Sequence, residues 1–204
     1  MKKWTLLLLW SSCSFAGVLY TDLGPGSSFG GAYTAAGGSG LIQYGTTFTA
    51  ANSGILSQVL VPVGDDPLTT LTFDLYSDNG SGQPGVLLEE WLNMTVPQLT
   101  ALVTLASVAH PSILAGNAYW FTATSANIPA DGIHFGLQWA DSPILSGGGI
   151  WSPNGSGGWT NIFTTSPQAA VELDSAAPEP GSWVLLGCGL ATLLAKYRGR
   201  SSMR

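Results

Sequence analysis

All six Lys and Arg residues of this chain lie at its two ends, at positions 2, 3, 196, 198, 200 and 204. The twelve Asp and Glu residues lie between Asp22 and Glu179, so the long middle stretch carries acids but neither Lys nor Arg. No ion pair with Lys or Arg is therefore available to stabilise this stretch. Its fold must rest on the burial of apolar side chains and on backbone hydrogen bonds.

The same distribution of charge restricts the partners of the middle stretch. Nucleic-acid binding depends on Lys and Arg side chains that neutralise phosphates, so we expect no nucleic-acid partner. A polyanion would also be repelled unless a divalent cation bridged it. Cys13 and Cys188 both lie in the terminal segments. The middle stretch therefore has no cysteine for a disulfide, a thiol nucleophile or a zinc site.

Between residues 17 and 174, short apolar and β-branched stretches alternate with clusters of Gly, Asn, Pro and Ser. This pattern is typical of an antiparallel all-β domain, and no amphipathic helix interrupts it. Nine or ten strands over this length predict an antiparallel two-sheet sandwich of jelly-roll type. The clearest expected strands are 18–23, 41–50, 55–63, 69–77, 86–92, 100–108, 118–124, 133–140 and 169–173, and the Gly-rich segment 24–40 is expected to be a loop.

The N-terminus has the three parts of a secretory signal peptide. Met1-Lys2-Lys3 is basic, residues 4–10 are apolar, and Ser14-Phe15-Ala16 supplies the small residues that signal peptidase requires. We therefore expect residues 1–16 to be removed and the mature domain to span residues 17–174. A lipoprotein signal at Cys13 is the alternative, although Trp10 stands where such a site prefers Leu.

The C-terminus also has three parts. A linker, 175–180, ends in Pro178-Glu179-Pro180, an apolar run follows over 181–195, and the chain ends with Lys196, Arg198, Arg200 and Arg204. The run predicts a transmembrane helix over 181–197, with 198–204 as a basic cytoplasmic end. Its uncharged part is shorter than the roughly 17 to 25 residues that span a bilayer. A C-terminal core helix of a soluble domain is the alternative.

This order of parts resembles the PEP-CTERM sorting signal of exported proteins in Gram-negative bacteria. The resemblance rests on Pro178, Glu179 and Pro180, the apolar run, and the basic residues Lys196, Arg198 and Arg200. It implies that a membrane-embedded exosortase cuts near the Pro-Glu-Pro motif. The precursor would be anchored transiently in the inner membrane, and the product would reach the cell surface or the extracellular matrix.

The middle stretch resembles a second family, the choice-of-anchor R type of exported β-sandwich domain. The resemblance rests on the run from Leu71 to Asp78, the turn Gln83-Pro84-Gly85, and Leu114-Ala-Gly-Asn117 before Tyr119-Trp-Phe121. In that family a middle domain of unassigned biochemistry is combined with different C-terminal anchors. The resemblance implies a fold and a surface location, and it implies no activity.

Calcium is the metal that an acidic domain without cations would suit best, because hard oxygen ligands are abundant. Asp74, Asp78 and Asn79 lie close together in the sequence around a turn and are weak calcium candidates. Their spacing matches no calcium loop, and Asp and Asn are ordinary turn residues. We therefore expect no metal or other cofactor and favour a structural turn, with calcium as the alternative.

The acids do not predict an enzyme. A glycosidase needs two carboxyl groups that converge, whereas Glu89 and Glu90 are adjacent and point to opposite faces of a strand. No serine nucleophile motif, zinc-protease motif or phosphate-binding loop is present.

Tryptophans give the other candidate site. We expect Trp120 and Trp139 to lie in the core, whereas Trp151 and Trp159 flank the Gly-rich loop 152–158. There the two rings would either stack on a sugar or fold inward. The leading prediction is an exported, non-enzymatic surface or extracellular-matrix protein. A carbohydrate-binding module for extracellular polysaccharide is the alternative, and a glycan-active enzyme is the second alternative.

Overall fold

The computed structural model describes residues 17–34, 40–66, 70–128, 136–145, 151–153, 158–161 and 168–176. Residues 18–176 form one compact unit. The expected signal peptide and the C-terminal segment from residue 177 onward lie outside the described residues. Within the described ranges, no helix is long and apolar enough to cross a membrane.

The described residues fold into strands and contain no helix, which confirms the all-β prediction. Every pairing between strands is antiparallel. The strands are β1 (Val18–Thr21), β2 (Ala32–Thr34), β3 (Gly40–Thr49), β4 (Gly54–Asp66), β5 (Thr70–Asp78), β6 (Pro84–Thr95), β7 (Ala101–Ala106), β8 (Ser112–Ile113), β9 (Ala118–Ile128), β10 (Gly136–Ala140), β11 (Trp151–Pro153), β12 (Trp159–Asn161) and β13 (Glu172–Ser175).

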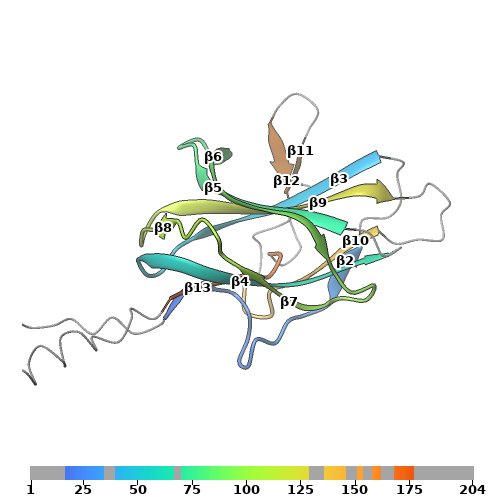
Figure 1. Ribbon diagram of the computed structural model, residues 1–204, viewed down its shortest axis with the longest axis horizontal. Helices are drawn as coiled ribbons and strands as arrows, with labels where there is room; N and C mark the ends of the chain where they lie inside the picture. Colours follow the sequence, from blue (N-terminus) through green and yellow to red (C-terminus); the bar gives the residue numbers. More distant parts are fainter. Residues whose placement is uncertain are drawn as a thin grey trace, which may run out of the picture. The chain divides into compact units, whose positions relative to one another are not determined.

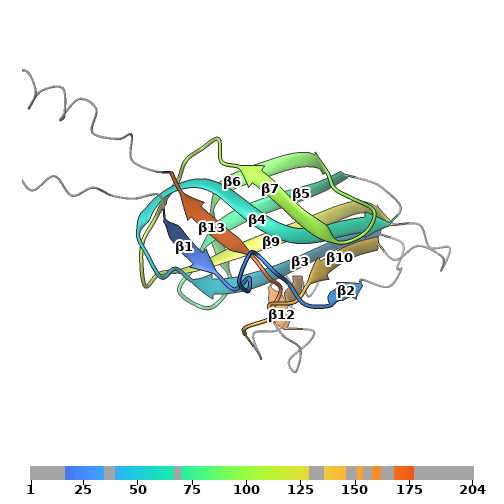
Figure 2. The same cartoon turned by 90° about the horizontal axis from the view of Figure 1, so that it is seen from below.

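Two sheets make up the unit. A seven-stranded sheet is built around the long strand β4, which pairs with β13 and β10 along one edge and with β8 and β7 along the other. Strands β1 and β2 extend it beyond β13 and β10. The six-stranded sheet has the order β12-β11-β3-β9-β5-β6. Figures 1 and 2 show β3, β9 and β5 side by side in one layer and β4, β7 and β13 in the other.

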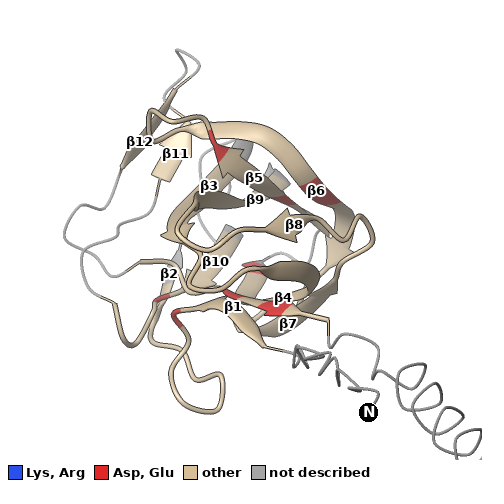
Figure 3. Cartoon of the chain, turned by 90° about the vertical axis from the view of Figure 1, so that its left-hand side faces the viewer, with Lys and Arg blue, Asp and Glu red and all other residues tan. Residues whose placement is uncertain are grey.

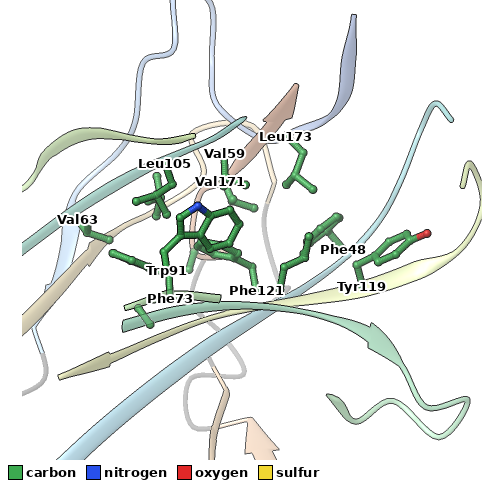
Figure 4. Close-up of a cluster of buried hydrophobic side chains, with 14 of the residues drawn as sticks. Phe48, Val59, Val63, Phe73, Trp91, Leu105, Tyr119, Phe121, Val171 and Leu173 are labelled. Atoms are coloured by element: carbon green, nitrogen blue, oxygen red, sulfur yellow. The ribbon is translucent and has the colours of Figure 1, made fainter. Parts of the chain in front are cut away.

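The core lies between the two sheets, because each contributes one apolar face (Figure 4). Leu71, Phe73 and Leu75 of β5 are fully buried, as their alternation predicts. Aromatic contacts link the layers: the ring of Phe121 on β9 lies 5.9 Å from that of Trp139 on β10. The indole of Trp91 on β6 donates to the carbonyl of Ala106 on β7 at 2.7 Å.

The structure departs from the expected strands in three places. The hairpin of β11 and β12 lies between two of the expected strands, and β11 includes residues 152 and 153 of the expected loop 152–158. Segment 24–40 was expected to be a loop, but it contains β2, whose three residues pair with β10. The two residues of β8 pair with the start of β4 and have no counterpart in the expected strands. Strands β2 and β8 are too short to show an alternating pattern, and the partner strand defines each of them.

Candidate functional site

The outer face of the six-stranded sheet, turned away from the core, carries the candidate tryptophans. Along β9, Tyr119, Phe121 and Ala123 belong to the core cluster, so Trp120 and Thr122 point to the opposite face. Trp120 is nevertheless fully buried. The expectation that Trp120 is buried is therefore confirmed, but its ring lies outside the cluster between the sheets.

The hairpin of β11 and β12 covers Trp120. The rings of Trp120 and Trp151 are 5.3 Å apart and meet edge to face, and those of Trp120 and Trp159 are 5.8 Å apart. Trp151 and Trp159 are each half-buried. We call these three residues the tryptophan cluster. Trp151 and Trp159 are partly accessible to solvent, and both pack against the buried ring of Trp120.

Gly45 on β3 has no side chain, and this leaves space for the tryptophan cluster. A Cβ atom at Gly45 would lie 2.9 Å from Cζ3 of Trp159 and 3.3 Å from Cγ2 of Thr122. The missing side chain therefore lets the Trp159 ring lie against the sheet. Gln83 fixes the backbone of Trp159, since its Oε1 accepts from the Trp159 amide at 2.6 Å and its Nε2 donates to the Trp159 carbonyl.

Strand register places five residues in one row across this face. Trp151 on β11 pairs with Gly45, Gly45 pairs with Thr122, Thr122 pairs with Asp74, and Asp74 pairs with Glu90 on β6. Directly paired residues of antiparallel strands point to the same face. With strands ~4.8 Å apart, this outer-face row is about 19 Å long. One end is aromatic and the other is acidic.

Asp74 is the buried member of the acidic end, with 6% of its surface exposed. Its Oδ2 accepts hydrogen bonds from the Tyr76 hydroxyl at 3.1 Å and the Thr122 hydroxyl at 3.3 Å, whereas its Oδ1 is buried without a partner. Burial, and then the charge of Glu90, raise the pKa of Asp74. Burial and the neighbouring Asp74 raise the pKa of Tyr76 to about 12. Glu90 is exposed.

Asp78 and Asn79 use their side-chain oxygens within the turn between β5 and β6. Asp78 accepts from the Trp120 indole at 2.9 Å and from the Gly80 amide at 2.6 Å. Burial raises the pKa of Asp78, but the hydrogen bonds from Trp120, Gly80 and Gly82 outweigh it and hold the pKa below its usual value. Asn79 Oδ1 accepts from the amide and the hydroxyl of Ser81.

The calcium candidates do not come together. Asp74 and Asp78 are four residues apart on β5, which is roughly 13 Å along a strand. Among the residues that the structure describes, no three His, Cys, Asp or Glu side chains are grouped to hold a metal. The turn at Asp78 and Asn79 has a structural role, and calcium binding stays an untested hypothesis.

Glu89 and Glu90 point to opposite faces of β6, as adjacent strand residues should. Glu89 is buried on the inner side, where its carboxylate accepts from the amides of Val108 and Ala109 and from the Ser107 hydroxyl at 2.6 Å. Glu89 therefore anchors the loop after β7. Glu90 instead lies opposite Asp74 on the outer face.

Sequence reasoning found the two outer tryptophans but missed Gly45, Tyr76, Thr122 and Gln83. Their roles depend on strand register, which no local pattern in the sequence encodes. The residues of the expected sorting signal lie outside the described ranges.

The fold and this face define a class of protein: an all-β, two-sheet domain with aromatic and acidic side chains on the outer face of one sheet. No protein-family model, curated protein or solved structure matches the chain.

Proposed function

We propose that this protein is exported to the cell surface or extracellular matrix, where its β-domain binds carbohydrate without catalysis. The observation that carries the binding proposal is the tryptophan cluster. Trp151 and Trp159 lie on the outer face of a sheet, half-buried, and rest on a fully buried third indole. Partly exposed rings held rigidly by packing suit the apolar faces of sugar rings, because little side-chain entropy is lost on binding.

The export proposal rests on the two ends of the sequence. The signal-peptide pattern over 1–16 and the PEP-CTERM resemblance over 178–204 support the same route, since the first sends the chain across a membrane and the second retains it there. Signal peptidase and an exosortase would be its processing enzymes. Release near Pro178 to Pro180 leaves a domain without Lys or Arg.

The jelly-roll arrangement is part of this proposal. Strands β7, β4, β13 and β1 are neighbours in one sheet, and β3, β9, β5 and β6 are neighbours in the other. The chain passes between the sheets from β3 to β4, from β4 to β5, from β6 to β7 and from β8 to β9. Repeated crossing between two packed antiparallel sheets supports a double Greek key.

Carbohydrate binding is tested by titrating the purified full-length protein with a panel of soluble oligosaccharides in a calorimeter. We expect binding to at least one oligosaccharide. Trp159→Ala should weaken this binding at least tenfold, and Trp159→Phe should weaken it less, because a ring is kept. Leu102→Ala is the control, since Leu102 is a partly exposed side chain on the other sheet. Absence of heat across the panel would refute carbohydrate binding.

The same samples test the absence of catalysis. Reducing ends are measured after long incubation with the oligosaccharide that binds. We expect no release above that of a boiled sample, and release that Glu90→Gln abolishes would replace this proposal with a glycan-active enzyme.

Sorting is tested by the intact mass of the protein recovered from the cell surface or medium of an exosortase-bearing host. We expect a chain that ends near Pro178 to Pro180, and a Glu179→Ala variant that keeps its tail. A wild-type surface form that still ends at Arg204 would contradict the sorting proposal.

A further inference from the structure

The acidic end of the outer-face row lies on the same sheet face as the tryptophan cluster. Asp74 and Glu90 are paired on neighbouring strands. Thr122 lies between this pair and the aromatic end: its hydroxyl donates to Asp74, and its methyl group and the Trp159 ring both lie close to the Gly45 position. No Lys or Arg lies among the described residues, so no Lys or Arg side chain compensates these carboxylates (Figure 3).

Asp74 is an unusual residue for the outer face of a sheet. It is more than nine-tenths buried, and its Oδ1 has no hydrogen-bond donor, although Oδ2 has two. A buried carboxylate oxygen without a partner costs stability. Burial keeps this oxygen out of reach of a ligand, so contact with an external cation falls to the exposed carboxylate of Glu90, the residue paired with Asp74.

We propose that this face binds a glycan that carries ammonium groups, a polymer of 2-amino sugars with free amines, on Trp159, Trp151 and Glu90. This inference rests on the proposed carbohydrate binding and specifies its ligand. The exposed carboxylate of Glu90 makes the direct contact with an ammonium group. Asp74 adds negative charge behind Glu90, and the partly exposed indoles accept the faces of neighbouring sugar rings.

Two interactions favour a glycan with ammonium groups at this face. An ammonium group next to a carboxylate forms a charge-assisted hydrogen bond, and an ammonium group over an indole face gains a cation–π interaction. The row is about 19 Å long, which is long enough for its aromatic and acidic ends to contact different sugar units of one chain. A uronic-acid polymer would instead face Asp74, Asp78 and Glu90 with like charge.

The test is calorimetric titration of the full-length protein with a glucosamine hexamer, its fully N-acetylated counterpart and an oligogalacturonate. We expect the glucosamine hexamer to bind at least tenfold more tightly than the N-acetylated hexamer in low salt, and oligogalacturonate not to bind. Raising the salt from about 20 to 300 mM should remove most of that preference, because screening weakens exposed charge pairs.

Variants separate this inference from simple charge attraction. Glu90→Gln should reduce glucosamine binding about tenfold and leave binding of the N-acetylated hexamer unchanged. Glu172→Gln removes the same charge from the other sheet and should have no effect. Equal binding of both hexamers, unaffected by Glu90→Gln, would overturn the ligand class and leave carbohydrate binding standing. Oligolysine binding as tight as that of the glucosamine hexamer would also overturn it.

Discussion

Gly45 shows how a single residue decides whether an aromatic ring can lie against a sheet. Its neighbours leave no space for a side chain, because the Trp159 ring and the Thr122 methyl group fill the position. Gly45→Val should therefore lift Trp159 from the sheet and lower the free energy of unfolding by about 1–3 kcal/mol. Urea denaturation measures this change. Gly31→Val is the matched control, since no atom lies within 4 Å of a Cβ there. Equal effects of the two substitutions would contradict this account of the cluster.

Asp22 gives the residue-scale prediction for pH. It is fully buried, its Oδ1 accepts from the Val171 amide at 2.6 Å, and its Oδ2 has no partner. Burial is the main reason that its pKa rises to about 7, from 3.8. Between these two values the folded state keeps a proton that the unfolded state has lost. The contribution of Asp22 to the free energy of unfolding is therefore complete below about pH 4. It decreases as the pH rises towards 7 and is lost above 7, by about 4 kcal/mol at most.

The variant that checks this is Asp22→Asn, which keeps an oxygen acceptor for Val171 and cannot ionise. Its free energy of unfolding, measured in urea between pH 4.5 and 8, should fall less steeply with pH than that of the wild type. Leu102→Ala removes an exposed apolar side chain, leaves every acid in place and should keep the wild-type slope. Parallel curves for Asp22→Asn and the wild type would show that Asp22 does not titrate in this range.

Adjacent residues on a strand can have opposite roles, as β6 demonstrates. Glu89 holds the loop 107–110 from the inner side, while Glu90 is exposed on the outer side. Glu89→Ala should remove acceptors from two amides and one hydroxyl and cost about 2–4 kcal/mol of unfolding free energy, whereas Glu90→Ala should change it by less than about 0.5 kcal/mol. Hydrogen exchange at the Val108 and Ala109 amides should accelerate only in Glu89→Ala. Protection that survives Glu89→Ala would mean that other groups hold the loop.

Strands could be predicted from the sequence where apolar residues occupy every second position and so share one face of the strand. The alternation of Leu71, Phe73 and Leu75 identified β5 and its buried face. The same reasoning did not find β2 or β8, because strands of two or three residues carry no period. The same reasoning assigned Trp120 to the core between the sheets. Trp120 is instead buried on the outer face, because the hairpin with Trp151 and Trp159 covers it, and a strand pattern cannot show that cover. Register, and with it the pairing of Asp74 with Glu90, is a property of two strands and cannot be read from either.

The whole domain is a case of folding without compensating cations. The described residues carry Asp and Glu on both sheets and no Lys or Arg, so long-range electrostatic interactions among them are mainly repulsive. Apolar burial between the sheets must offset this repulsion. The high content of buried aromatic rings, which bridge the layers at Phe121, Trp91 and Trp139, is consistent with that requirement.

Salt should therefore stabilise this domain at neutral pH. Exposed like charges repel over a Debye length of about 30 Å at 0.01 M salt but only about 8 Å at 0.15 M, so added salt screens the repulsion in the folded state. No Lys or Arg ion pair lies in the described part of the chain to be weakened at the same time. We expect the thermal midpoint at pH 8 to rise by several degrees between 10 and 150 mM sodium chloride, by an amount on the order of 1 kcal/mol in unfolding free energy. At pH 4, where many carboxylates are protonated, the rise should be smaller, because less charge remains to be screened. A midpoint that falls with salt at pH 8 would mean that attractive ion pairs, and not apolar burial against net repulsion, control the stability of the fold.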